Sequence, residues 1–97
     1  METFRLEFLD GFSGDLVVVR IEGREAYRAH PRNRDRTSIR LPDRKPRFTL
    51  DVQIPARGVF SSFGLDAPAV EAGLCVWLEP SGIVGFRIGP PEDGGKR

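Results

Sequence analysis

The sequence predicts a small all-β domain, an antiparallel β-sandwich of seven or eight strands. Eight short stretches place apolar residues at every second position, which is the spacing of a strand with one buried face. Glycine or proline separates these stretches, and none of them has the periodicity of an amphipathic helix. A chain of 97 residues can bury one core without disulfides or metals. We therefore expect a single domain over residues 1–88.

The N-terminal part of the chain contains three predicted strands, at residues 4–8, 16–21 and 24–30. Residues 10–15 are rich in glycine and aspartate, which tolerate positive φ, so we expect a turn there. Residues 16–21 have apolar side chains on both faces, which is typical of a central strand. The dipeptide Glu22-Gly23 then predicts a tight hairpin with the glycine in a left-handed conformation.

The middle of the chain contains the clearest strand. Residues 30–35 are polar and include Pro31, so we expect a loop or a sheet edge, followed by a short strand at 39–41. Proline at both ends of residues 42–46 predicts a turn. Residues 47–54 alternate strictly, and their apolar members are Phe48, Leu50, Val52 and Ile54.

The C-terminal part is expected to contain the last three strands. Residues 55–58 form a turn, and a strand weakened by serine and glycine follows at 59–65. Residues 66–73 can form at most a single helical turn. The runs 74–78 and 83–88 are separated by Pro-Ser-Gly and should pair as a hairpin.

The chain ends and the cysteine content indicate the cellular setting. Residues 89–97 lack large apolar side chains and are rich in chain breakers and charges, so we expect a flexible tail. The single cysteine, Cys75, excludes an intramolecular disulfide. The sequence has neither a secretory leader nor an apolar run of membrane-spanning length. These features favour a cytoplasmic protein that does not bind membranes.

The two signs of charge are distributed unevenly along the chain. Residues 28–47 carry eight basic and two acidic side chains, or +6, whereas the remainder carries −5. This segment is either a polyanion-binding surface, with nucleic acid as the commonest such partner, or a solvated or ion-paired face. Only Tyr27 at its edge could stack on a base, and no nucleic-acid motif is present. The candidate polyanion-binding residues are Arg28, Arg32, Arg34, Arg36, Arg40, Arg44 and Lys45.

Catalytic and metal-binding chemistry has little support in the sequence. His30 is the only histidine and lies in a polar loop, and Cys75 lies among core leucines and valines. Neither residue belongs to a nucleophile–base pair or has metal-ligand spacing. We therefore predict a non-enzymatic protein without metal, cofactor or small-molecule substrate.

Two large aromatic residues, Phe60 and Trp77, point away from the main apolar sets of their strands. They lie either in the second layer of a sandwich or in an exposed patch for a protein partner or a sugar ring. We take both as candidate partner-binding residues. Together with the separation of charge, they favour self-association.

Residues 16–54 resemble small bacterial PEGA-type and transthyretin-like β-sandwich modules. In those modules an apolar strand ends in an Asp-Gly or Glu-Gly hairpin, here Glu22-Gly23. A leucine-proline unit, here Leu41-Pro42, then leads through a turn into an alternating strand. The resemblance implies a β-sandwich and an interaction or accessory role, and it transfers no functional residue.

The function predicted from the sequence is a non-enzymatic binding or assembly module, an accessory subunit of a bacterial complex. It is expected to bind a protein partner or a second copy of itself. The alternative is a nucleic-acid-binding or polyanion-binding accessory protein that uses the basic segment Arg28–Arg47.

Overall fold

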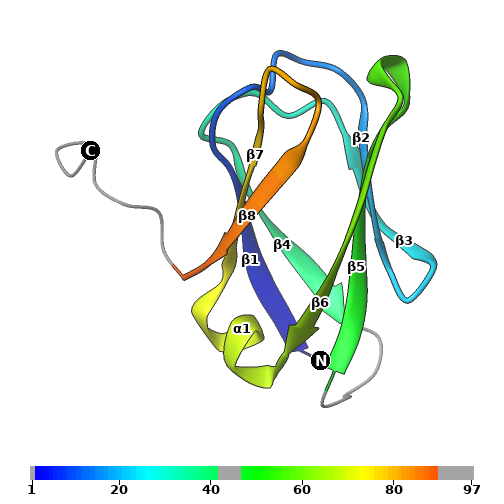
Figure 1. Cartoon of the computed structure of the whole chain (residues 1–97). Coiled ribbons are helices and arrows are strands. Elements are labelled where there is room, and N and C mark those ends of the chain that lie inside the picture. The colour runs from blue at the N-terminus through cyan, green and yellow to red at the C-terminus, as the bar shows by residue number, and fades with distance from the viewer. Residues whose placement is uncertain (1, 42–46, 90–97) are drawn as a thin grey trace, which may run out of the picture.

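The computed structural model describes residues 2–41 and 47–89, which form two packed four-stranded β-sheets (Figure 1). The strand order is β4-β1-β7-β8 in the first sheet and β3-β2-β5-β6 in the second sheet. The all-β class is confirmed. The elements are β1 (Glu2–Phe8), β2 (Val17–Ile21), β3 (Arg24–Ala29), β4 (Arg36–Leu41), β5 (Arg47–Ile54), η1 (Pro55–Arg57), β6 (Val59–Asp66), α1 (Ala67–Ala72), β7 (Leu74–Leu78) and β8 (Val84–Ile88).

The core lies between the two sheets and is built by alternate residues of their strands. In β5, the four apolar residues predicted to face inward are all buried, and Leu50 and Val52 have no exposed surface. They pack with Leu6 of β1 and Val76 of β7 in one apolar cluster that spans both sheets. The predicted strand at residues 47–54 is therefore confirmed, with its predicted bounds.

The strand β2 is central, as predicted, because it lies between β3 and β5. Val18 faces away from the core, yet it is only 3% exposed, so the strand is covered on both sides at this point. The hairpin from β2 to β3 is also confirmed. Glu22 and Gly23 have φ values of 51° and 83°, which is the pattern of a type I′ turn.

Two expectations need correction. The strands β1 and β7 pair in parallel, with Leu6 opposite Leu74, whereas an entirely antiparallel sandwich was predicted. Side-chain alternation is the same in both strand directions, so the pattern could not distinguish them. The helix α1 has six residues instead of a single turn, because three of the six are alanine, the best helix former.

The residues 30–35 form a loop, as expected, but the loop is not wholly outside the core. Pro31 is fully buried. The turn at 42–46 and the tail at 89–97, apart from Gly89, lie outside the described residues. Within the described ranges, no helix is long and apolar enough to cross a membrane.

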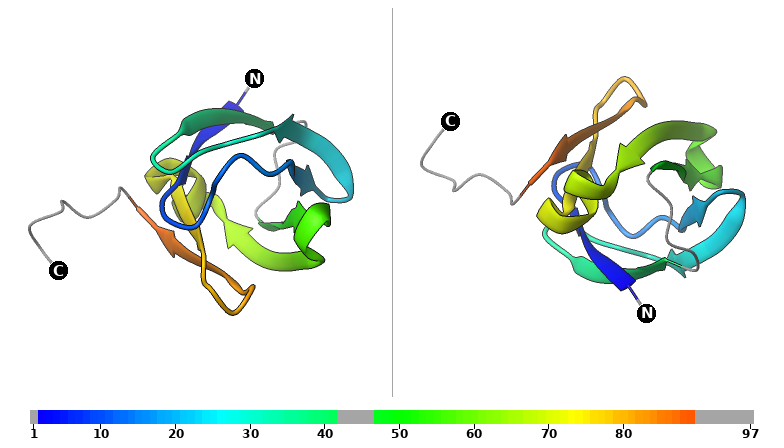
Figure 2. Two further views of the ribbon diagram at one scale, coloured as in Figure 1. Left: turned by 90° about the horizontal axis from the view of Figure 1, so that it is seen from above. Right: turned by 90° about the horizontal axis from the view of Figure 1, so that it is seen from below.

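The edge strands of the two sheets meet on two opposite sides of the molecule. End-on views show β3 beside β4 on one side and β6 beside β8 on the other (Figure 2). We call them the β3–β4 side and the β6–β8 side. This division sets the location of both candidate surfaces.

Candidate functional site

The β6–β8 side carries the exposed large apolar residues of the described chain. Their exposed fractions are 61% for Phe60, 61% for Ile83, 40% for Phe86 and 47% for Ile88. Phe86 and Ile88 lie on the same side of β8 as the buried Val84. They are exposed because β8 is the last strand of its sheet.

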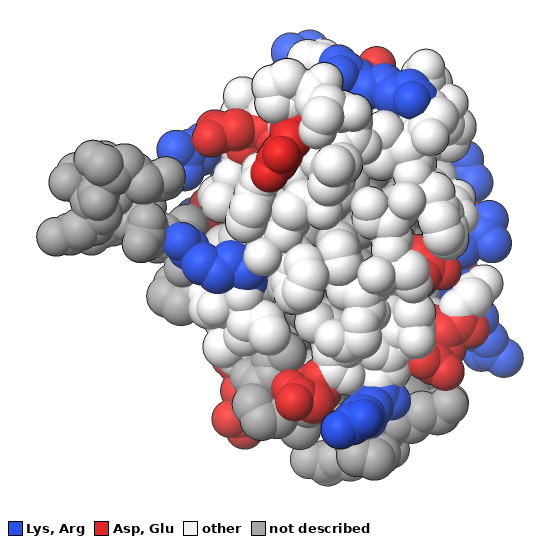
Figure 3. Space-filling view, in the orientation of Figure 1, with Lys and Arg blue, Asp and Glu red and all other residues white. Residues whose placement is uncertain are grey.

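Contacts between the two sheets bring these side chains together. The rings of Phe63 and Phe86 lie 4.3 Å apart between centroids, which joins β6 to β8. A Cβ atom on Gly82 would lie 3.9 Å from Cγ2 of Val59, so the turn before β8 lies against the start of β6, next to Phe60. In the space-filling view, the face over β6 and β8 is broad and uncharged, with charged side chains at its margins (Figure 3).

The backbone of β8 presents free hydrogen-bonding groups on this side. The N–H of Glu79 donates to the carbonyl of Ile83, and the N–H of Gly89 donates to that of Gly73. In an antiparallel ladder, residues turned toward the neighbouring strand alternate with residues turned away from it. Because the register from Leu74–Ile88 to Leu78–Val84 is unbroken, Val84, Phe86 and Ile88 direct their N–H and C=O groups away from β7.

The same reasoning applies to β6. The N–H of Glu22 donates to the carbonyl of Thr49, so Thr49 of β5 turns its backbone groups toward β2 and away from β6. Thr49 lies opposite Gly64, and the register of β5 with β6 is regular from Ile54–Val59 to Arg47–Asp66. Residues 60, 62 and 64 therefore direct their backbone groups away from β5. Two free strand edges thus lie side by side on the β6–β8 side.

The edges on the β3–β4 side are different, because charged residues protect them. The strand β3 contains Arg24, Glu25 and Arg28, and β4 contains Arg36 and Arg40. A bulge also interrupts the pairing of β3 with β2. Charges and bulges are the usual means of blocking edge-to-edge pairing. By contrast, β6 and β8 contain one charged residue each.

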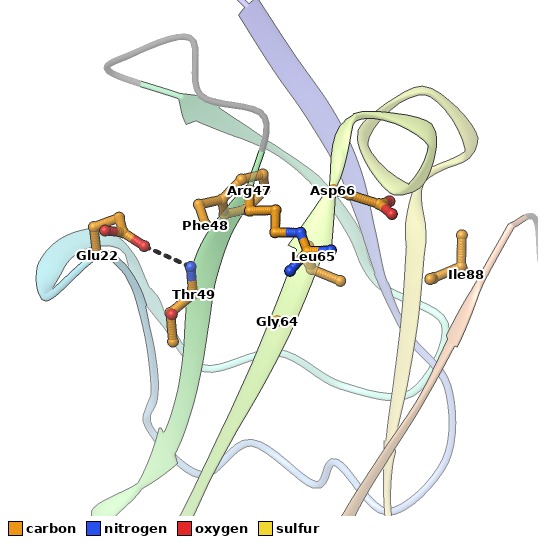
Figure 4. A pocket seen from close by; sticks show the side chains of 8 residues that line it. All are labelled: Glu22, Arg47, Phe48, Thr49, Gly64, Leu65, Asp66 and Ile88. Carbon is orange, nitrogen blue, oxygen red and sulfur yellow. Dashed lines mark hydrogen bonds between the residues drawn. The ribbon is translucent and has the colours of Figure 1, made fainter.

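A pocket of about 470 Å³ lies at the end of the β6–β8 side (Figure 4). Ile88 contributes from β8, and the Arg47 side chain extends from β5 toward β6. At its rim, the Glu22 carboxylate accepts a hydrogen bond from the N–H of Thr49 at 2.7 Å. The lining residues are Glu22, Arg47, Phe48, Thr49, Gly64, Leu65, Asp66 and Ile88. This lining of apolar and charged groups is suited to holding a side chain or peptide segment.

The candidate polyanion-binding residues do not form one surface. Arg28 lies on β3 and pairs with Glu25 at 2.8 Å. Their hydrogen bond lowers the pKa of the Glu25 carboxyl group and raises that of the Arg28 guanidinium group. Arg32 and Arg34 lie in the loop between β3 and β4. Arg36 and Arg40 lie on the outer face of β4, and Arg44 and Lys45 lie outside the described residues.

Hydrogen bonds fix the loop that carries Arg32 and Arg34. The N–H of Arg32 donates to Oδ2 of Asp35 at 2.8 Å, and the N–H of Arg34 donates to the carbonyl of Phe8 at 2.6 Å. Oδ1 of Asn33 accepts the N–H of Phe12 at 2.8 Å. The two arginines are therefore presented from an ordered loop, away from the β6–β8 side.

Arg5 joins Arg36 and Arg40 on the outer face of the first sheet, which the sequence reading missed. The register of β1 and β4 places Arg5 opposite Ser38, between the two arginines of β4. The alternation of residues 4–8 indicated that Arg5 faces outward. Its position beside β4 required the strand pairing, which the pattern does not contain.

The two candidate partner-binding residues lie on different sheets. Phe60 is on the outer face of the second sheet, opposite Gln53. Trp77 is partly buried on the outer face of the first sheet, where its indole covers Gly85 and its Nε1 donates to Oε2 of Glu79 at 3.3 Å. Phe60 adjoins the β6–β8 side, whereas Trp77 is held flat against its own hairpin.

Cys75 and His30 belong to residue types that often act in catalysis, but both make structural contacts in this fold. Cys75 is 1% exposed, its Sγ donates to the carbonyl of Gly89 at 3.3 Å, and burial raises the pKa of its thiol. His30 is exposed, with Nδ1 3.0 Å from the carbonyl of Gly14. The described residues contain no group of three side chains placed to hold a metal ion.

Comparison with protein-family models, curated proteins and solved structures found no match to this chain.

Proposed function

We propose that the chain is a β-sandwich module that binds another protein chain through the β6–β8 side, as a non-enzymatic accessory subunit of a larger assembly. The observation that carries this proposal is the pair of free strand edges flanked by exposed Phe86 and Ile88. An added strand would satisfy the free backbone groups and remove these apolar side chains from water. The β3–β4 side also has unpaired strand edges, but charged residues line them and neither strand carries a large exposed apolar side chain.

Affinity capture with matched variants tests this proposal. One variant changes Phe86 and Ile88 to serine, and the control changes Arg36 and Arg40 to serine. The expected result is that partners recovered with the unmodified chain are lost with the first variant and kept with the control, while circular dichroism shows both variants folded. Identical recovery with both variants would contradict the proposed binding surface.

The second candidate function is polyanion binding, which the outer face of the first sheet favours. Arg5 lies between Arg36 and Arg40 in the register, and its Nη2 donates to the carbonyl of Ala72 at 3.5 Å. No acidic side chain that the structure describes forms an ion pair with Arg36 or Arg40. Glu7 lies opposite Arg36 in the register and reduces the positive charge of this face. Guanidinium groups spaced along two strands match the repeating phosphates of a nucleic acid.

Binding to duplex DNA at varied salt tests this second candidate. Affinity should fall by about 0.9 log unit per log unit of salt for each phosphate neutralised, and changing Arg36 and Arg40 to serine should reduce that slope. Undetectable binding at low salt would leave these arginines as a solvated face.

A further inference from the structure

We propose that β8 pairs with β8 of a second copy of this chain, antiparallel and centred on Phe86, so that the two first sheets become one continuous sheet. This inference rests on the proposed function and names the partner as the chain itself. Figure 1 shows β8 at the end of its sheet, and no strand of the described chain is hydrogen-bonded to its free edge.

The free backbone groups of β8 can pair with the same groups of a second copy that is related by a two-fold axis. They belong to Val84, Phe86 and Ile88, which are symmetric about Phe86. A two-fold axis at Phe86 pairs Phe86 with itself and Val84 with Ile88 of the second copy. Residues of these pairs exchange two N–H···O bonds when both turn their backbone groups toward each other, which is the case here.

The side chains on the core-facing side of β8 would also pair favourably with those of the second copy. Phe86 would lie beside Phe86 of the second copy, and Ile88 beside Val84 of the second copy. These apolar pairs would cover side chains that are 40% exposed at Phe86 and 47% exposed at Ile88 in the single chain. Cross-strand aromatic and β-branched pairs of this kind stabilise sheets.

On the outer face, the same register keeps like charges apart. Arg87, the one charged residue of β8, would lie opposite Gly85 of the second copy, whose face is covered by the Trp77 indole. No two arginines would face each other directly. In contrast, a two-fold axis at Ser38 of β4 would place Arg36 opposite Arg40, which is unfavourable.

The neighbouring edge, β6, is a poorer candidate for self-pairing. Its core-facing apolar side chains, Val59, Phe63 and Leu65, are already at most 8% exposed, and Phe60 is the one large exposed apolar residue of this strand. Pairing there would form hydrogen bonds but could cover only Phe60, whereas pairing at β8 covers both Phe86 and Ile88. Of the four edge strands, β8 alone combines free backbone groups, exposed apolar side chains and a charge pattern compatible with its own copy.

The test is the mass of the purified chain across a concentration series, measured by light scattering or sedimentation. The mass should rise from 10.8 kDa toward twice that value. Phe86→Lys should keep the chain monomeric, because it places two ammonium groups on the two-fold axis. Ile88→Pro should do the same, because it removes an N–H that points away from β7 while leaving the β7–β8 ladder intact.

Ser38→Lys is the matched control, since it places the same charge on an exposed residue of the edge strand β4 and should dimerise like the unmodified chain. A monomer mass at every concentration would overturn the dimer, as would a dimer that survives Phe86→Lys and Ile88→Pro. If the chain is monomeric but capture of another protein still requires Phe86 and Ile88, the inference fails and the proposed function stands. If both results are negative, both fail.

Discussion

At the scale of single residues, Gly11 shows how a close backbone approach fixes the residue type. Its φ is 93°, and a Cβ atom there would overlap the carbonyl oxygen of Leu78. Gly82 has a similar φ of 91° but would meet only Cγ2 of Val59, at an ordinary 3.9 Å. Gly82→Ala should therefore cost about 1–3 kcal/mol from backbone strain alone.

Gly11→Ala should cost about 1–3 kcal/mol more than Gly82→Ala, because the new methyl group must also displace the backbone of β7. Chemical denaturation of the two variants measures the difference. Equal costs would mean that the turn can move away from Leu78.

The core assignment is tested at two adjacent residues of β5. Leu50 has no exposed surface, whereas Thr49 is exposed on the opposite face. Leu50→Ala should reduce the free energy of unfolding by about 2–5 kcal/mol, and Thr49→Ala by less than about 1 kcal/mol. A larger loss at Thr49 would show that the wrong face of β5 has been assigned to the core.

Cys75 predicts a dependence of stability on alkaline pH. Burial, together with the charge of Glu7, raises the pKa of its thiol in the folded state. The unfolded chain therefore loses this proton first, near its ordinary pKa of about 8.5, and stability falls as the pH rises above that value.

The free energy of unfolding should decrease more steeply between about pH 8 and about pH 10 in the unmodified chain than in Cys75→Ala, by up to about 1.4 kcal/mol per pH unit. Denaturant titrations at each pH provide the comparison. Parallel slopes for the two proteins would contradict a buried thiol.

At the scale of elements, the hairpin between β2 and β3 combines strain with a compensating hydrogen bond. Glu22 has φ of 51°, a conformation that costs a residue with a Cβ atom about 1–2 kcal/mol. Its carboxylate accepts a hydrogen bond from the N–H of Thr49 at 2.7 Å. The carboxylate thus replaces the backbone carbonyl that β2 would supply if the strand continued past Ile21.

Glu22→Ala loses the hydrogen bond and retains the strain, so it should lower stability by about 1–2 kcal/mol. Glu22→Gly loses the same bond but relieves the strain, and it should be less destabilising by about 1 kcal/mol. Thermal unfolding of the two variants tests this order. The reverse order would mean that the turn is not strained at Glu22.

The strands and hairpins could be predicted from the sequence because alternation and turn residues are local signals. The bounds of β5 and the pairing of β2 with β3 and of β7 with β8 are confirmed. The parallel pairing of β1 with β7 was not predictable, since it joins residues far apart in the sequence and leaves no periodic pattern. The same limit hid the position of Arg5 beside β4.

The candidate site could be predicted only in part, for a reason that also concerns pairing. Phe60 was recognised because it breaks the alternation of its strand. Phe86 and Ile88 follow the alternation and so resemble core residues, although they are 40% and 47% exposed. Their exposure results from the position of β8 at the end of a sheet, and strand order is not a local property of the sequence.

At the scale of the whole molecule, the two sides of the domain differ in chemistry. The β3–β4 side is charged along both of its edges, whereas the β6–β8 side has free backbone groups and exposed apolar side chains. A monomeric protein usually protects every exposed edge. The proposed binding through the β6–β8 side accounts for this unequal protection, because a partner would cover the less protected side.

Amide hydrogen exchange, resolved by residue, tests this claim most directly. The N–H groups of Phe86 and Ile88 point away from β7, so they should exchange rapidly in the dilute chain and slowly in the assembled state. The amides of Arg36 and Arg40 on β4 should exchange at the same rate in both states. Rapid exchange at Phe86 and Ile88 in the assembled state, or new protection confined to β4, would contradict binding through the β6–β8 side.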